Sequence, residues 1–144
     1  MINETIIRTR YAETDQMGIV YHANYFVWFE IGRTEFFRQL NMNYKELEEE
    51  NILLPVIDVG CKYIQSAKYD DEVAIKTRLT KLKGVKLVFS YEIIRKNDNV
   101  LLAEGYTKHA FVTKELKPVN FKKKMPHVWE ALDQSIEGGD DSVI

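Results

Sequence analysis

A long apolar segment of helical period, followed by segments of strand period, most strongly constrains the fold of this chain. Between residues 24 and 40 the phenylalanines recur near one stripe, and Val27, Trp28 and Ile31 widen the apolar surface beyond that of an ordinary amphipathic helix. The pattern predicts a helix over residues 24–40 that needs burial on most of its sides.

The sequence changes to a period of two after this helix. A strand predicted over residues 53–63 carries on one face Ile57, Val59, Cys61 and Tyr63. Weaker alternation predicts a first strand over residues 5–11. Three later strands are predicted over residues 72–82, 85–96 and 100–113. The turns between the later strands are short and indicate antiparallel hairpins. An antiparallel sheet wrapped around one long helix, an α+β fold, is the simplest arrangement of these elements.

Length and composition favour a single domain. The chain has 144 residues, of which 45% are hydrophobic, enough for one core and too few for two ordinary domains. We expect one domain over residues 1–134 and a frayed tail over residues 135–144. A polar helical turn over residues 44–50 is predicted to be a solvated connector, and residues 121–126 and 128–132 to form a surface closure.

Charge and cysteine content limit the partners and the location. The net charge is −2 and the twenty basic residues are spread along the chain, so no global field favours nucleic acid or an anionic membrane. Cys61 is the one cysteine, which excludes an internal disulfide, and neither a leader nor a membrane-length apolar run opens the chain. We therefore expect a cytoplasmic protein with no nucleic-acid partner and no membrane span.

The segment over residues 11–25, YAETDQMGIVYHANY, has the composition of an active-site loop. Asp15 and Gly18 indicate a turn, because aspartate bonds its own backbone and glycine tolerates positive φ. Asn24 is predicted to be the N-cap of the following helix. The first N–H groups of that helix, near residues 22–24, carry partial positive charge and could stabilise a developing oxyanion. An ordinary turn and an ordinary cap are the alternative that local spacing leaves open.

The spacing of this loop matches a known family signature. The matching residues are Tyr11, Thr14, Asp15, Gly18, Val20, Tyr21, His22 and Tyr25. The pattern closely resembles that of the 4-hydroxybenzoyl-CoA thioesterase-like proteins, which are hot-dog-fold acyl-CoA thioesterases. The resemblance extends to about Val119 and includes the element Ala67-x-x-Asp70-Asp71. Ser66 departs from the family pattern, which usually has a proline before the alanine, so we expect a different local bend.

The resemblance implies a hot-dog fold and hydrolysis of an acyl-CoA thioester to a carboxylate and free coenzyme A. It implies that Asp15 acts as general base or as nucleophile, with Tyr11 and His22 as further catalytic residues beside it. The helix start near residues 22–24 would polarise the thioester carbonyl. Substrate contacts are expected from Met17, Gly18, Tyr21, Asn24 and Tyr25. Coenzyme A is part of the substrate, and no metal or redox cofactor is implied.

Coenzyme A also carries several phosphates, which must meet cations or backbone donors. Lys81, Lys83 and Lys86 flank a turn at Gly84 and are candidates for this contact, or for contact with the acidic surface of an acyl carrier protein. A solvated lysine-rich hairpin is the alternative. The resemblance further implies a homo-oligomer, a dimer or a tetramer, since an exposed sheet edge invites pairing. The site would then lie at a subunit interface.

Other reactive side chains are expected to be structural. Glu30 is expected to pair with Arg33 inside the apolar helix, and it is the fallback catalytic carboxylate if Asp15 proves dispensable. His109 is expected to be a satisfied core or interface histidine. Cys61 has no neighbour in sequence that would activate it, so a nucleophilic role is not expected. The three histidines do not have the spacing of metal ligands; they are His22, His109 and His127.

Two rival functions stay open at this point. A hot-dog hydratase or dehydratase would use His22 with a carboxylate to move protons at the β-carbon of an acyl chain. A noncatalytic module would bind acyl-CoA or acyl carrier protein without turnover. Fold resemblance does not decide between them. Acyl specificity depends on how aromatic residues such as Trp28, Phe29 and Tyr63 pack across subunits.

Overall fold

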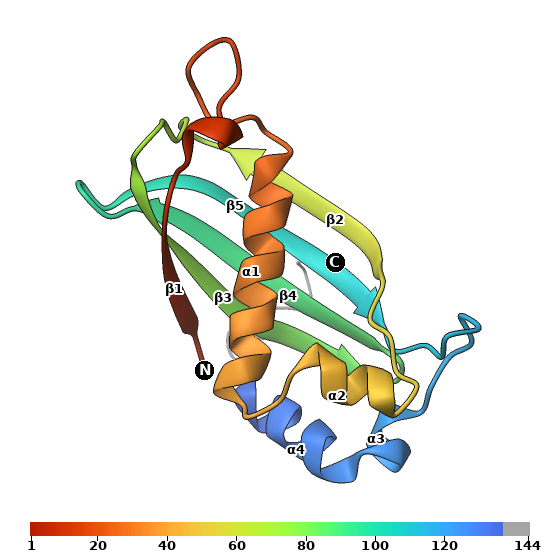
Figure 1. Ribbon diagram of the computed structural model, residues 1–144. Helices are drawn as coiled ribbons and strands as arrows, with labels where there is room; N and C mark the ends of the chain where they lie inside the picture. The colour runs from red at the N-terminus through yellow and green to blue at the C-terminus, as the bar shows by residue number, and fades with distance from the viewer. Residues whose placement is uncertain (137–144) are drawn as a thin grey trace.

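The apolar helix lies along one face of a five-stranded antiparallel sheet (Figure 1). In this computed structural model, which describes residues 1–136, the strand order is β1-β3-β4-β5-β2. The strands are β1 (Asn3–Arg8), β2 (Val56–Tyr63), β3 (Glu72–Lys83), β4 (Lys86–Arg95) and β5 (Val100–Ala110). The helices are η1, a short 3-10 helix (Tyr11–Glu13), α1 (Asn24–Gln39), α2 (Tyr44–Glu49), α3 (Phe121–Lys124) and α4 (Pro126–Ser135). The predicted α+β arrangement, a sheet curved around one long helix, is confirmed.

Aromatic side chains on one side of α1 form the centre of the core. Trp28 and Phe29 are fully buried, and Phe29 stacks on Tyr91 of β4 with ring centroids 4.3 Å apart. Gly32 allows the helix to approach β3 closely, because a Cβ at this position would collide with the hydroxyl of Thr77. Burying one large apolar side chain contributes roughly 1.5–3 kcal/mol, so this stripe fixes the helix on the sheet.

The opposite side of α1 is not covered within one chain. Phe26 and Val27 are 37% and 47% exposed, and Glu30 beside them is exposed as well. The prediction of burial on most sides therefore holds only for the side that faces the sheet. The predicted pairing of Glu30 with Arg33 is wrong: Arg33 turns toward the sheet and donates to the Tyr91 hydroxyl at 3.3 Å, and Glu30 forms no ion pair within residues 1–136.

Arg33 begins a chain of buried hydrogen bonds. The Tyr91 hydroxyl lies 2.6 Å from Oγ1 of Thr107, which lies 2.8 Å from Nε2 of His109. Nδ1 of His109 lies 3.1 Å from the Leu54 carbonyl oxygen. The histidine is 1% exposed, so the prediction of a satisfied core histidine is confirmed. Burial, together with the charge of Arg33, lowers the pKa of His109 to about 4.

The observed strand ends differ from the predicted ones by a few residues. β1 stops at Arg8, and Tyr11 lies in η1. β2 begins at Val56 rather than at residue 53, although Leu53 still pairs with Val112 as an isolated bridge beyond the ends of β2 and β5. Strand ends depend on tertiary hydrogen bonds that an alternating pattern does not encode.

β2 is an edge of the sheet, and its apolar side chains stay exposed within one chain. It pairs with β5 and ends the strand order. Four apolar side chains of β2 are between 41% and 49% exposed: Val56, Ile57, Val59 and Tyr63. The alternating pattern predicted the strand correctly, but nothing in the described chain covers its apolar face.

The C-terminal helices contribute to the core rather than only closing the surface. Phe121 of α3 stacks on Phe111 with ring centroids 4.1 Å apart, and Leu132 of α4 is fully buried. Ser135, which was expected to lie in a frayed tail, ends α4, and its hydroxyl donates to the Leu132 carbonyl at 2.6 Å. Ile136 of the predicted tail follows the helix as its C-cap, and residues 137–144 lie outside the described residues.

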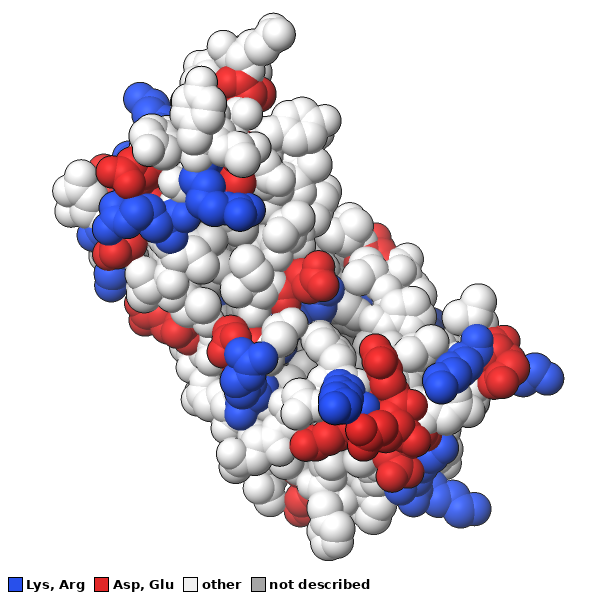
Figure 2. Space-filling view, in the orientation of Figure 1, with Lys and Arg blue, Asp and Glu red and all other residues white. Residues whose placement is uncertain are grey.

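α2 is exposed over most of its residues, as the prediction of a solvated connector expects, but one side chain anchors it in the core. Leu47 is 1% exposed, and Asn43 caps the helix by accepting the Glu46 N–H at 2.9 Å. The glutamates of α2 face solvent and form an acidic patch at this end of the molecule (Figure 2). Among the described residues, no helix has both the length and the apolar composition that crossing a bilayer requires.

We predict that protonation of His109 destabilises the fold in mild acid. Its pKa is about 4 in the folded chain, below the ordinary 6.5, so the unfolded chain takes up this proton first as the pH falls. The stabilising contribution is complete above about pH 6.5 and is lost toward about pH 4, a change of about 3 kcal/mol in the free energy of unfolding. Urea unfolding across this range should show a smaller loss for His109→Gln than for the parent, and equal losses would contradict the account.

Candidate functional site

The loop between η1 and α1 is a small hairpin that fixes the Asp15 carboxylate. The Asp15 N–H donates to the Ile19 carbonyl at 2.9 Å, and the Gly18 N–H donates to the Asp15 carbonyl at 3.0 Å. Gly18 has a φ of +78°, in the region that glycine tolerates best. Oδ1 of Asp15 accepts the Met17 N–H at 2.8 Å. Oδ2 accepts no hydrogen bond within residues 1–136, so it is available to a substrate or a water.

The start of α1 differs from the prediction at Asn24. This residue is the first residue of the helix rather than its N-cap, and its side chain donates to the Glu13 carbonyl at 2.8 Å instead of accepting from the helix. The N–H groups of Asn24 and Tyr25 donate to the carbonyls three residues earlier, in a tight first turn. Among the described residues, the N–H groups of His22 and Ala23 have no acceptor. The free donors are therefore these two and not that of Asn24.

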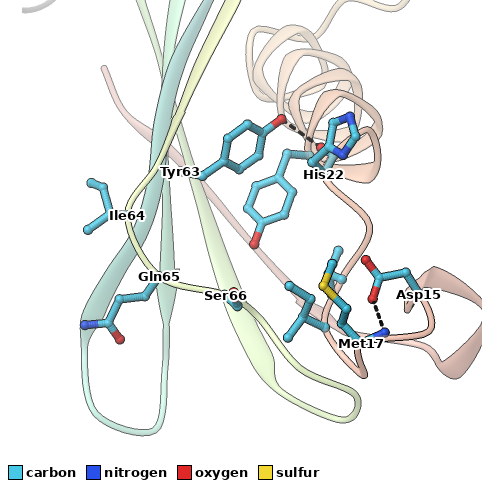
Figure 3. Close-up of a pocket in the computed structure, with 10 residues that line it drawn as sticks. Asp15, Met17, His22, Tyr63, Ile64, Gln65 and Ser66 are labelled. Atoms are coloured by element: carbon cyan, nitrogen blue, oxygen red, sulfur yellow. Dashed lines mark hydrogen bonds between the residues drawn. The ribbon is translucent and has the colours of Figure 1, made fainter.

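A pocket lies between this loop, the start of α1 and the end of β2 (Figure 3). Its lining residues are Asp15, Met17, Ile19, Val20, His22, Tyr25, Tyr63, Ile64, Gln65 and Ser66. Its volume is about 210 Å³. Pockets that enclose a drug-sized ligand run from about 300 to 1,000 Å³. This pocket therefore has room for the reacting end of a substrate rather than for a whole coenzyme.

Two tyrosines tie the walls of the pocket together. The Tyr63 hydroxyl donates to the His22 carbonyl at 2.9 Å, which links the end of β2 to the start of α1. The Tyr25 hydroxyl accepts the Ala67 N–H at 3.2 Å, and the rings of Tyr25 and Tyr63 meet edge to face with centroids 5.0 Å apart. Partial burial raises the pKa of Tyr63 to about 12, so its hydroxyl remains a donor at neutral pH.

The pocket brings together some of the predicted site residues and not others. Those that line it are Asp15, Met17, His22 and Tyr25. Tyr11 does not reach it: this residue is 76% exposed, and its ring packs edge to face on Tyr69 with centroids 5.7 Å apart. Gly18, Tyr21 and Asn24 shape the loop and the helix start without lining the pocket. The roles assigned to these residues stay predictions.

The lysine-rich hairpin lies at the other end of the sheet (Figure 1). Lys81 and Lys83 line a separate hollow there with Lys108, next to the turn at Gly84. β3 runs from Glu72, which pairs with the end of β1 beside the loop, to this hairpin. A rise of about 3.3 Å per residue makes that strand roughly 35 Å long. Within one chain, the structure does not bring the predicted phosphate contacts to the Asp15 pocket.

The segment after β2 forms one wall of the pocket and was not among the predicted site residues. Ile64, Gln65 and Ser66 line the pocket because the Val20 N–H donates to the Ala67 carbonyl at 2.8 Å and draws this segment against the loop. The available signal was the family element that begins at Ala67. Ser66, the departure from the family pattern, therefore lies in the pocket itself.

The arrangement suits chemistry on an acyl group. A carboxylate oxygen without an internal partner can act as base or nucleophile, and free backbone N–H groups nearby can stabilise an oxyanion. The His22 ring forms no hydrogen bond to Asp15 in the described part of the chain; it lies between the rings of Tyr21 and Tyr63, at centroid distances of 4.5 Å and 6.2 Å. Residues 1–136 contain no group of three or more His, Cys, Asp or Glu side chains placed to hold a metal ion.

Comparison with known proteins identifies the family. The model of the thioesterase-like superfamily matches residues 9–132. The chain belongs to this superfamily. Among its relatives, YneP of Bacillus subtilis is 37% identical over 135 residues, which cover 93% of this chain and 97% of that protein. The acyl-CoA thioesterase YbgC of Haemophilus influenzae is 34% identical over 128 residues, which cover 88% of this chain and 93% of that protein.

Solved structures of other proteins share the fold. The DHNA-CoA thioesterase from Staphylococcus aureus aligns with a TM-score of 0.88 and 33% identity, covering 92% of this chain and 89% of that one. The hypothetical protein TT1821 from Thermus thermophilus aligns with a TM-score of 0.85 and 32% identity, covering 95% of this chain and 99% of that one. The predicted hot-dog fold and the predicted family are both confirmed.

We predict that Gly18→Ala lowers the free energy of unfolding by about 1 kcal/mol, because an L residue is strained at this φ. A Cβ at Gly18 meets no atom within 4 Å, so the backbone conformation is the whole of the cost. Gly84→Ala is the matched control, since Gly84 also has positive φ, +61°, and open space around it. Urea unfolding should give similar losses for both variants. A Gly18→Ala variant as stable as the parent would show that the hairpin does not hold this turn.

Proposed function

We propose that the chain hydrolyses an acyl-CoA thioester to a carboxylate and free coenzyme A at the Asp15 pocket. The observation that carries the proposal is the unpartnered Oδ2 of Asp15 at a small pocket that His22 also lines. The N–H groups of His22 and of its neighbour Ala23 have no acceptor among the described residues. Family membership supports the same chemistry, because the relative YbgC is an acyl-CoA thioesterase. Water is the only other reactant that this hydrolysis needs.

Two routes are compatible with this geometry. In the first, Oδ2 of Asp15 takes a proton from a water whose oxygen bonds to the thioester carbonyl carbon. In the second, Oδ2 itself bonds to that carbon, and water then hydrolyses the resulting anhydride. In both routes the N–H groups of His22 and Ala23 stabilise the negative carbonyl oxygen before the carbon–sulfur bond breaks and the thiolate leaves. The thiolate takes its proton from Asp15 in the first route and from the water that hydrolyses the anhydride in the second. His22 and Tyr63 would hold the helix start that carries these donors.

The substrate extends beyond the pocket. At about 210 Å³ the pocket holds the thioester and a short part of the acyl group, and the nucleotide end of coenzyme A lies outside it. Lys81 and Lys83 can meet the phosphates at this pocket only if a second copy of the chain carries its own hairpin there, because the two sites are far apart within one chain. An acyl carrier protein is the other acyl donor that this basic hairpin would suit.

A homo-oligomer is part of the proposal. The exposed apolar face of β2 adjoins the pocket through Tyr63, and the outer side of α1 exposes Phe26 and Val27. Much of the surface over α1 and β2 is uncharged in the view of Figure 2. An exposed apolar edge strand favours pairing with a second copy. A second chain placed along β2 would enclose the open side of the pocket.

The rival functions have less support. A hydratase or dehydratase would need His22 and a carboxylate to act together on one carbon. The His22 ring instead contacts the rings of Tyr21 and Tyr63 and forms no bond to Asp15 in the described residues. A noncatalytic binding module would not need a carboxylate oxygen kept free beside oxyanion donors. The thioesterase proposal uses the free oxygen of Asp15 and does not require a bond between His22 and Asp15.

We predict that Asp15→Asn lowers kcat for acyl-CoA hydrolysis by at least about 100-fold, because the amide cannot act as base or nucleophile. Thiol release from short, long and aromatic acyl-CoAs measures this. The matched control is Asp133→Asn, which changes an exposed aspartate on α4 and should retain parental turnover. Undiminished turnover in Asp15→Asn would reject the assignment and point to Glu30. Tight acyl-CoA binding without turnover by the parent would support the binding module instead.

We predict that the parent runs in solution at a multiple of 16.9 kDa and that Ile57→Lys shifts it to the single-chain mass. A lysine on an edge strand opposes edge-to-edge pairing. Light scattering after size exclusion measures both masses, and thiol release should fall together with the mass. The control Leu116→Lys changes an exposed leucine outside β2 and should leave the mass unchanged. A parent of single-chain mass would contradict the oligomer.

A further inference from the structure

We infer that Glu13 is a positioning residue that holds the Asp15 hairpin against the start of α1. The inference rests on the function proposed above. Glu13 does not line the pocket, and it is 8% exposed. Its side chain and its backbone both bind groups that frame the reacting atoms.

The Glu13 carboxylate joins two elements that are separate in the sequence. Oε1 accepts the backbone N–H of Arg10 at 2.8 Å, just before η1. Oε2 accepts the indole N–H of Trp28 at 3.1 Å, in the second turn of α1. Trp28 is fully buried on the core side of the helix, so this bond ties the loop to the hydrophobic core.

The Glu13 carbonyl fixes the other end of the hairpin. It accepts the Tyr21 N–H at 2.8 Å and the Asn24 side-chain amide at 2.8 Å. Asp15 lies two residues after Glu13, and His22, which carries a free N–H, follows Tyr21 directly. One residue therefore sets the spacing between the carboxylate and the oxyanion donors.

The chemical nature of this side chain supports a positioning role over a merely stabilising one. A buried carboxylate must be compensated, and Arg10, whose Nε lies 3.6 Å from Oε1, is 77% exposed and gives only partial compensation. An apolar side chain of similar size would fill the same space without that cost. What an apolar side chain cannot do is accept the N–H groups of Arg10 and Trp28 at once. A displacement of about 1 Å between reacting groups can lower a rate by roughly 100-fold, so such bonds matter most for kcat.

The test is Glu13→Gln, which keeps the size of the side chain and loses one acceptor. We expect kcat for thiol release to fall by about tenfold or more, with KM within about twofold of the parent. The assay is run where circular dichroism shows parent and variant fully folded, because a merely structural role would leave the kcat of folded protein unchanged. Glu72→Gln is the matched control: Glu72 is exposed, pairs with Arg8 at 3.3 Å and lies at the same end of the sheet.

A second variant removes the same bond from the other side. Trp28→Phe deletes the donor to Oε2, and we expect it to lower kcat as well. The double variant should be no slower than the slower single variant, because both changes break one interaction. If Glu13→Gln does not fold, the kcat of Trp28→Phe alone tests the positioning role.

The outcomes separate this inference from the proposed function. A parent without turnover on any acyl-CoA would reject the proposed function. In another outcome the parent turns over acyl-CoA and Asp15→Asn loses activity, while folded Glu13→Gln or Trp28→Phe keeps the parental kcat. That result would overturn the positioning role alone. Independent, multiplicative losses in the double variant would also overturn it, since they would show that the two residues do not act through one bond.

Discussion

The burial of the aromatic side of α1 against the sheet is the interaction on which the rest of the structure depends. Phe29 stacks on Tyr91, and Gly32 lets the helix backbone come close to β3. This packing fixes the direction of the helix, so its first turn meets the end of β2 and the loop that carries Asp15. Trp28 connects the core to the loop, because its ring is buried in the core and its indole N–H donates to the Glu13 carboxylate. The core thus sets the geometry of the candidate site.

The local hydrogen bonds of the loop and of the first turn of α1 explain why one carboxylate oxygen and two backbone N–H groups have no partner among the described residues. The turn at Asp15 uses Oδ1 for the Met17 N–H and leaves Oδ2 without a partner among the described residues. The tight first turn of α1 satisfies the N–H groups of Asn24 and later residues, which leaves those of His22 and Ala23. A carboxylate oxygen and backbone donors that the fold does not consume can act on a substrate without first breaking internal bonds.

Sequence patterns predicted what depends on local spacing, and they failed where distant contacts decide. The periods of α1 and of the strands were sufficient for the fold, and the contiguous motif around Asp15 predicted four of the residues that line the candidate pocket. The wall formed by Gln65 and Ser66 depends on a bond between Val20 and Ala67, which no local pattern reveals. The orientation of Arg33 toward Tyr91 rather than Glu30 is likewise determined by a tertiary contact. The lysine hairpin fits the chemistry of phosphate binding, but the length of β3 separates it from the pocket within one chain.

A crystal structure with a hydrolysis-resistant acyl-CoA analogue, in which CH₂ replaces the thioester sulfur, would show whether the thioester binds beside Asp15. We expect the analogue's carbonyl oxygen to lie about 2.7–3.1 Å from the His22 or Ala23 nitrogen. The carbonyl carbon should lie about 3–3.5 Å from an Asp15 oxygen or from a water bound to it. An analogue whose carbonyl instead lies beside Glu30, on the outer side of α1, would rule out hydrolysis at Asp15.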